Sequence, residues 1–251
     1  MTVKKLSRHL AKCGLPLALI ASAFPAYADS ILPDTASQGP VVIELYTSQG
    51  CVSCPPADEY MAELVKDPRL LPLALHVDYW DYIGWQDHFA KPEYTERQKS
   101  YAKAVGSRTI YTPQFIVSGE NRIEGHSPEM TKAAIDAALL ERKSIKLQAE
   151  RKGDILTIRA EADPPLDQPV RVHLVRYISE QTVEIERGEN AGKTVTYHNI
   201  VSDWQLLGDW IGDDNLDVDV PITGTEEAAV LLQKLGPAKI VAASLVPPEL
   251  P

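Results

Sequence analysis

Residues 44–58 read ELYTSQGCVSCPPAD, and the fold prediction starts from this segment. Cys51 and Cys54 are separated by two residues, and two prolines follow directly. Prolines are tolerated in the first turn of a helix but not in its interior, so a helix is expected to begin close to Cys54. The apolar run at residues 41–46 is typical of a buried strand. The segment therefore predicts a strand, a loop that carries Cys51, and a helix.

This placement of the two cysteines fits thiol–disulfide exchange. Exchange needs one sulfur that ionises near neutral pH and a second sulfur that resolves the mixed disulfide. The unpaired N–H groups and the dipole at a helix N-terminus favour a thiolate there. We therefore expect Cys51 to be the nucleophile, open to water, and Cys54 to be the resolving thiol.

The first 28 residues have the pattern of a secretory signal peptide. Four basic residues open it, an apolar run follows at residues 15–25, and Ala26-Tyr27-Ala28 is a cleavage site of the A-x-A type. We expect cleavage after Ala28 and a secreted or periplasmic protein. No membrane insertion is expected after cleavage, because the apolar run is too short to span a bilayer. Cleavage also removes Cys13 and leaves the two cysteines of the motif.

The charge of the chain excludes some partners. Its formal net charge of -10 becomes -14 once the four basic residues of the leader are removed. Nucleic acids and anionic membranes attract clustered positive charge, so neither is an expected partner.

A structural zinc site needs four ligands, and the sequence offers no second cysteine pair for one. We expect no cofactor and no metal, and protein thiols or disulfides as substrates.

The pattern of apolar residues predicts an α+β fold. Up to residue 143 we expect strands at residues 41–46, 71–77, 114–117 and 122–124 and helices at residues 57–66, 93–105 and 128–142. This order resembles the thioredoxin arrangement, with an aromatic, partly helical insertion. From residue 144, short alternating runs predict an antiparallel sheet, with one helix at residues 226–235. The predicted units are a signal peptide at 1–28, a thioredoxin-like α/β domain at 38–143, and a mostly antiparallel β domain at 144–251.

Thr112 and Pro113 are the predicted substrate-binding residues. In thioredoxin-like proteins a cis-proline lies opposite the dithiol, and the residue before it offers backbone groups to an extended substrate. Pro113 opens a predicted strand at the corresponding place, so we expect the Thr112–Pro113 bond to be cis.

His76 and Asp78 end a predicted strand and are candidates for a proton relay to Cys54. A satisfied polar pair at a strand end is the simpler interpretation. The aromatic residues that follow, Trp80, Tyr82 and Trp85, are expected to pack in the core. Asp81 and Asp87 are expected to be helix caps or solvated charges, and neither His173 nor His198 is expected to be a ligand.

Four segments carry a resemblance to a known family. Residues 44–58, residues 76–85 (HVDYWDYIGW) and residues 111–114 (YTPQ) are similar to the DUF1223 family of exported bacterial proteins, and residues 187–193 (RGENAGK) resemble its second half. The resemblance implies a thioredoxin-like fold with an appended β region, and it assigns no activity.

Three functional hypotheses follow. The first is an exported thiol–disulfide oxidoreductase that acts on protein thiols through Cys51 and Cys54. The second is a metal-handling protein for Cu(I), which thiolates prefer, with His76 as a third ligand. The third is a binding protein in which the disulfide is not catalytic.

Overall fold

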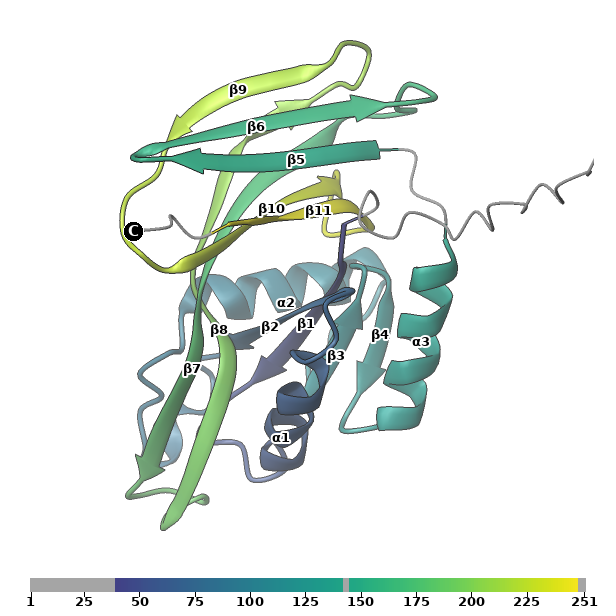
Figure 1. Ribbon diagram of the computed structural model, residues 1–251. Coiled ribbons are helices and arrows are strands. Elements are labelled where there is room, and N and C mark those ends of the chain that lie inside the picture. The colour runs from purple at the N-terminus through teal and green to yellow at the C-terminus, as the bar shows by residue number, and fades with distance from the viewer. Residues whose placement is uncertain (1–38, 142–144, 248–251) are drawn as a thin grey trace, which may run out of the picture. The chain divides into compact units, whose positions relative to one another are not determined.

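The computed structural model describes residues 39–141 and 145–247. These residues form an α+β fold, as the sequence predicted, with three α-helices, an eight-stranded mixed sheet and a three-stranded antiparallel sheet (Figure 1). Within these two ranges no helix is long and apolar enough to cross a bilayer. The predicted signal peptide lies outside the described residues.

The helices predicted at residues 57–66, 93–105 and 128–142 are all present. Up to residue 141 the elements are β1 (Val41–Thr47), α1 (Pro55–Leu64), β2 (Leu70–His76), the short 3-10 helix η2 (Asp81–Ile83), α2 (Pro92–Ala104), β3 (Gln114–Val117), β4 (Asn121–Glu124) and α3 (Pro128–Leu140). From residue 145 they are the strands β5 (Ile145–Lys152), β6 (Ile155–Ala162), β7 (Val170–Ile185), β8 (Lys193–Trp210), β9 (Leu216–Pro221), β10 (Glu227–Lys234) and β11 (Ile240–Val246).

The large sheet contains strands from both halves of the chain. Its order is β11-β10-β7-β8-β2-β1-β3-β4, and the small sheet has the order β5-β6-β9. β1 is parallel to β2 and antiparallel to β3. The two groups of strands meet where Ala74 of β2 pairs in parallel with Ile200 of β8. A domain division near residue 143 remains a prediction, and it would have to cut this sheet between β2 and β8.

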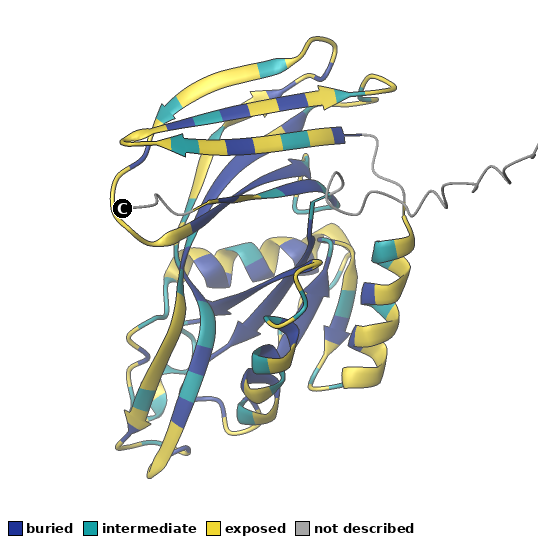
Figure 2. Ribbon diagram, in the orientation of Figure 1, coloured by how far each residue is buried: buried dark blue, intermediate teal, exposed yellow. Residues whose placement is uncertain are grey.

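Strand β1 is buried along its whole length because helices cover both faces of the sheet around it (Figure 2). Successive side chains of a strand point to opposite faces. Val42 and Tyr46 pack in the apolar cluster that includes Tyr94 of α2. Ile43 packs in the cluster that includes Met61 of α1. The loop that follows β1 therefore starts from a strand held firmly on both sides.

One predicted element is wrong. The helix expected at residues 226–235 is strand β10, which pairs with β7 on one side and β11 on the other. Its residues from Ala228 to Gln233 are all buried. A short apolar run that is buried on both faces has no periodicity that separates a strand from a helix. Pairing with β7, which is distant in sequence, and with β11, which follows directly, makes this run a strand.

Candidate dithiol site

Cys51 and Cys54 form a disulfide at the start of α1. The S–S distance is 2.07 Å and the Cα–Cα distance is 5.4 Å. Cys54 is the N-cap residue, and Pro55 and Pro56 occupy the first two helical positions. The backbone N–H of Asp58 donates to the Cys54 carbonyl over 3.1 Å, which closes the first helical turn. The strand–loop–helix placement expected from residues 44–58 is therefore present.

The exposure expected for Cys51 is wrong. Both cysteines are 0% exposed, although Val52 and Ser53 between them reach solvent. The sequence around the motif has no signal for this burial, because distant segments pack against the loop. Gly50 shows how close they come: a Cβ on Gly50 would lie 3.1 Å from the Cβ of Trp80.

The aromatic segment at residues 79–89 donates hydrogen bonds to two loops beside the disulfide, the loop after β1 and the loop before β3. Trp80 Nε1 donates to Thr112 Oγ1 over 2.7 Å. Trp85 Nε1 donates to Gln49 Oε1, also over 2.7 Å. The sequence predicted core packing for Trp80, Tyr82 and Trp85; the two tryptophans are partly buried, but the prediction is wrong for Tyr82, which is 81% exposed. The sequence did not predict that each indole N–H would anchor a loop beside the disulfide.

The turn between β7 and β8 reaches the dithiol from the second half of the chain. Asn190 is buried, and its amide group donates to the carbonyl of Gln49 over 2.9 Å and to the carbonyl of Cys51 over 2.8 Å. Lys193 Nζ donates to the side-chain oxygen of Asn190 over 2.7 Å. Sequence reasoning missed Asn190 as a site residue, and the one signal for it was the resemblance carried by residues 187–193.

Thr112 and Pro113 lie beside the motif. The Thr112–Pro113 bond is cis, as predicted. The hydroxyl of Ser53 donates to the Thr112 carbonyl over 3.4 Å, which joins the two segments. Strand β3 begins at the next residue, Gln114.

His76 and Asp78 do not form the expected pair. His76 Nδ1 lies 2.7 Å from Asp87 Oδ2, and both side chains are buried. Asp78 instead accepts a hydrogen bond from Thr95 Oγ1 over 2.6 Å. Asp87, which was expected to be a cap or a solvated charge, is the buried partner of His76. Asp81 caps no helix; it accepts a hydrogen bond from the Asp87 N–H over 3.1 Å within the loop.

In the pair between His76 and Asp87, each side chain favours the charged form of the other. Burial opposes ionisation of Asp87, but the charge and hydrogen bond of His76 and the N–H groups of Gln49 and Phe89 outweigh it, and the pKa of Asp87 falls below its ordinary value. Burial likewise opposes protonation of His76, but the charge and hydrogen bond of Asp87 raise the pKa of His76 above its ordinary value.

Asp58 is a second buried carboxyl beside the disulfide, and sequence reasoning did not single it out. Thr47 Oγ1 donates to Asp58 Oδ1 over 2.7 Å. Burial raises the pKa of Asp58 to about 7, against the opposing charge of His76. The other Asp58 oxygen and His76 Nε2 are both buried and have no hydrogen-bond partner among the described residues. Asp58 follows Cys54 by four residues, so both side chains lie on the same face of α1.

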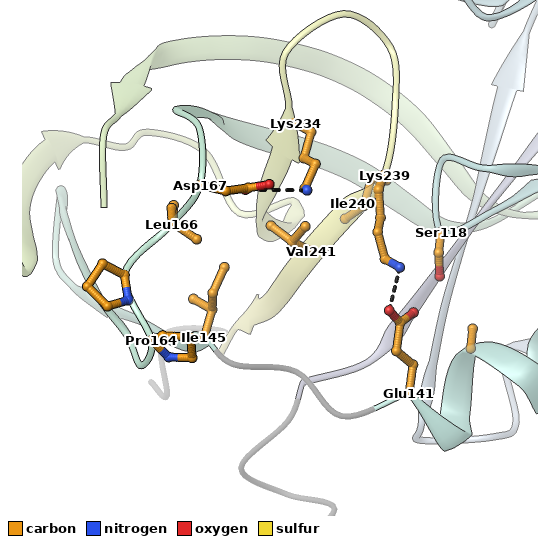
Figure 3. A pocket seen from close by; sticks show the side chains of 12 residues that line it. Ser118, Glu141, Ile145, Pro164, Leu166, Asp167, Lys234, Lys239, Ile240 and Val241 are labelled. Carbon is orange, nitrogen blue, oxygen red and sulfur yellow. Dashed lines mark hydrogen bonds and ion pairs between the residues drawn. The ribbon is translucent and has the colours of Figure 1, made fainter. Parts of the chain in front are cut away.

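A hollow elsewhere in the fold has its charged side chains in pairs, as far as the described residues show. It has a volume of about 330 Å³ and is lined by residues of α3, β11 and the segment before β7 (Figure 3). Lys234 pairs with Asp167, and Lys239 pairs with Glu141, all four lining the same hollow. These charges compensate one another within the hollow.

Comparisons with known proteins match most of the chain to one protein family and to two solved structures. Residues 42–233 match the model of a family described as "Protein of unknown function (DUF1223)". A crystal structure of an Agrobacterium tumefaciens protein is 33% identical, with a TM-score of 0.71, and the match covers 83% of this chain and 94% of that chain. HBP35 of Porphyromonas gingivalis is 15% identical, with a TM-score of 0.61, and the match covers 83% of this chain and 74% of that chain. At this identity the match shows a similar fold alone. No curated protein matches the chain.

Proposed function

Because this chain belongs to the DUF1223 family, whose function is unknown, we propose its function from the dithiol: it is an exported, thioredoxin-like thiol–disulfide oxidoreductase of protein thiols. One observation carries the proposal. A disulfide lies at the N-terminus of α1, and a buried carboxyl with a pKa of about 7 follows on the next turn of the same helix. Disulfide exchange needs a reactive sulfur pair and a nearby proton donor, and this arrangement supplies both.

A thioredoxin-like core is supported by three features of the first half. β1 is flanked by the parallel strand β2 and the antiparallel strand β3, and β3 pairs with β4. The loop after β1 delivers the disulfide to the start of α1. The cis bond before Pro113 lies next to that disulfide through the contact between Ser53 and Thr112.

The reaction that follows from this geometry conserves electrons and protons. A substrate thiolate attacks Cys51 Sγ, the Cys51–Cys54 bond breaks, and Cys54 leaves as a thiolate that takes the proton of Asp58. A second substrate thiolate attacks the substrate sulfur of the mixed disulfide and releases Cys51. Cys51 leaves as a thiolate and takes a proton from water, and Asp58 regains its proton from water; both protons replace those that the two substrate thiols released on ionising. The substrate gains a disulfide, and the two cysteines gain two electrons and two protons. In the reverse direction the same groups reduce a substrate disulfide.

Export of the protein is part of the proposal. It is supported by the basic and apolar pattern of residues 1–28 and by an acidic remainder whose cysteines are those of the motif. In an oxidising compartment the pair would rest as the disulfide seen here.

The burial of Cys51 favours one alternative, a binding protein whose disulfide is not catalytic. A Cu(I) site has less support, because the two sulfurs that would bind the metal are joined in a disulfide. Among the described residues no group of three or more His, Cys, Asp or Glu side chains is placed to hold a metal ion.

The deciding experiment uses the protein purified after export and processing. Wild type and Cys51→Ser are compared for oxidation of reduced ribonuclease and for reduction of insulin, with Cys54→Ser as the matched control. If the protein is an oxidoreductase, both variants lose turnover. Of the two, Cys54→Ser can still form the mixed disulfide with substrate, whereas Cys51→Ser cannot. Equal turnover by wild type and Cys51→Ser contradicts the proposal and favours the binding protein.

A further inference from the structure

The hairpin of β7 and β8 extends beyond the rest of the large sheet. Ile178 pairs with Ile200, and Ile185 pairs with Lys193 next to the turn. In the described chain, β8 pairs with β2 at the single position Ala74–Ile200. Between that position and the turn, the two strands pair with each other. A two-stranded hairpin is marginally stable by itself in water, so its position depends on what its side chains contact.

Apolar side chains hold this part of the hairpin against the aromatic segment. Tyr197 of β8 packs in a cluster that includes Trp85 and Phe89, and its ring lies 4.9 Å from the ring of His76. The turn comes equally close. A Cβ on Gly188 would lie 3.2 Å from the Cβ of Trp85, and the φ of +78° at this residue favours glycine.

Asn190 then bonds the turn to the dithiol loop. Its N–H groups reach the carbonyls on either side of Gly50, those of Gln49 and Cys51, and it is 1% exposed. These carbonyls belong to the loop that carries the sulfur. Reduction replaces the covalent bond by a non-bonded contact between two sulfurs that are 0% exposed, so the packing around them has to adjust when the bond opens.

We propose that residues 186–192 form a redox-coupled clasp, in which Asn190 holds the hairpin turn on the oxidised dithiol loop and reduction releases it. The clasp has two effects. It restricts access, because a reductant has to reach sulfurs that are 0% exposed. It also stabilises the oxidised state, because bonds made in one redox state shift the equilibrium toward that state. The clasp regulates the site of the proposed function, and it is tested without any protein substrate.

The chemical step of the test is reduction by dithiothreitol. One of its thiolates attacks a sulfur of the Cys51–Cys54 bond and forms a mixed disulfide. Its second thiol then closes the cyclic dithiothreitol disulfide, and both cysteines leave as thiols. Two electrons and two protons pass from dithiothreitol to the protein.

The main variant is Asn190→Asp. It keeps the shape of the side chain and an oxygen for Lys193, but it loses the N–H groups that bind the two carbonyls. Reduction by dithiothreitol is expected to be at least about tenfold faster than in wild type. The equilibrium with glutathione is expected to shift about tenfold toward the dithiol, which is about 30 mV for a two-electron couple.

Asn199→Asp is the matched control. Asn199 lies on the same hairpin, and its amide donates to the Pro72 carbonyl over 2.8 Å, so it also joins the two halves of the chain. Its φ of 47° is one that aspartate tolerates. This variant loses one amide-to-carbonyl hydrogen bond away from the dithiol, and it is expected to be reduced at the wild-type rate.

Amide exchange supplies a readout that a merely structural role would not move. In wild type, residues 186–192 are expected to exchange faster after reduction, and in Asn190→Asp the two redox states are expected to exchange alike. If Asn190→Asp fails to fold, Lys193→Met replaces it. Lys193 is exposed, and losing its bond to Asn190 is expected to speed reduction by a smaller factor.

Three results would overturn the clasp: reduction of Asn190→Asp (or Lys193→Met) at the wild-type rate, an equal acceleration in Asn199→Asp, or identical exchange of residues 186–192 in both redox states. Failure of the proposed function looks different. In that case wild type has no turnover on ribonuclease or insulin, while the rates with dithiothreitol still separate Asn190→Asp from Asn199→Asp.

Discussion

His76 Nδ1 lies 2.7 Å from Asp87 Oδ2, and together they form an ion pair removed from solvent beneath the dithiol loop. Asp87 also accepts from the N–H of Gln49, two residues before Cys51, over 2.8 Å. The pair therefore connects strand β2, the aromatic segment and the loop that carries the disulfide.

Asp87→Asn is expected to destabilise the fold. The substitution leaves a buried His76 without its counter-charge, and removing one member of a buried pair typically costs about 3–5 kcal/mol. The free energy of unfolding in urea measures the loss. Asp67→Asn, which breaks an exposed pair with Arg69, is the control and should change stability far less.

The pH dependence of this loss has a defined sign. The pKa of His76 is raised above its ordinary 6.5, so its stabilisation is complete below that pH and is lost as pH rises through the folded value. The pKa of Asp87 is lowered below its ordinary 3.8, so its stabilisation is present above that pH and is lost as pH falls through the folded value. The difference in the free energy of unfolding between wild type and Asp87→Asn should be largest between pH 3.8 and pH 6.5. A difference that does not depend on pH would contradict the charged pair.

Asp58→Asn is expected to flatten the stability profile of the oxidised protein. Because burial raises the Asp58 pKa from 3.8 to about 7, the folded state favours the protonated carboxyl. Its contribution is complete below pH 3.8 and is lost as pH rises through about 7. Asparagine resembles the protonated acid, so the variant should match wild type at about pH 4 and exceed its melting temperature at about pH 8. If the melting temperatures of wild type and Asp58→Asn change with pH in parallel, Asp58 does not titrate in this range.

The same substitution is expected to slow reduction of the disulfide. An asparagine side chain has no acidic proton to give to the Cys54 thiolate, and general acid–base groups contribute typically 10²–10⁴-fold, so a loss of about 100-fold is expected. Thr47→Val is the control: it removes a hydrogen bond that lowers the Asp58 pKa, so it should move the pH–rate profile to higher pH. A wild-type profile in Asp58→Asn would exclude Asp58 as the proton donor.

Trp80 and Thr112 are expected to be coupled energetically. Trp80→Phe keeps an aromatic ring but removes the N–H that donates to Thr112 Oγ1, and Thr112→Val removes the acceptor. Each single change should cost about 1 kcal/mol, the net contribution of a typical hydrogen bond. The double variant should cost less than the sum, which denaturation of all four proteins would show. Additive costs would mean that this bond does not stabilise the fold.

The sequence predicted the features that depend on neighbouring residues or on the fold context, such as the start of α1 and the cis bond before Pro113. The prolines after Cys54 marked the start of α1, and the family and fold context marked Pro113 as cis. Asp58 was within reach of the sequence, because its place four residues after Cys54 puts both on one helical face. Its burial, which sets its pKa, depends on segments beyond the helix.

Long-range contacts account for what the sequence could not predict. Asp87 replaces Asp78 beside His76 because the chain turns back after the aromatic segment. Asn190 reaches Cys51 from 139 residues away, and that separation leaves no periodicity or spacing to detect. The burial of Cys51 and the strand character of β10 are tertiary effects of the same kind.

The separation between Cys51 and Asn190 has a consequence for biosynthesis. A ribosome that adds about 5–20 residues per second needs roughly 7–30 s to make the 139 residues between them. During that interval the nascent chain carries both thiols without the partner that later bonds to their loop. An oxidant that meets the growing polypeptide therefore finds the sulfurs open, and the arrival of the hairpin ends that opportunity.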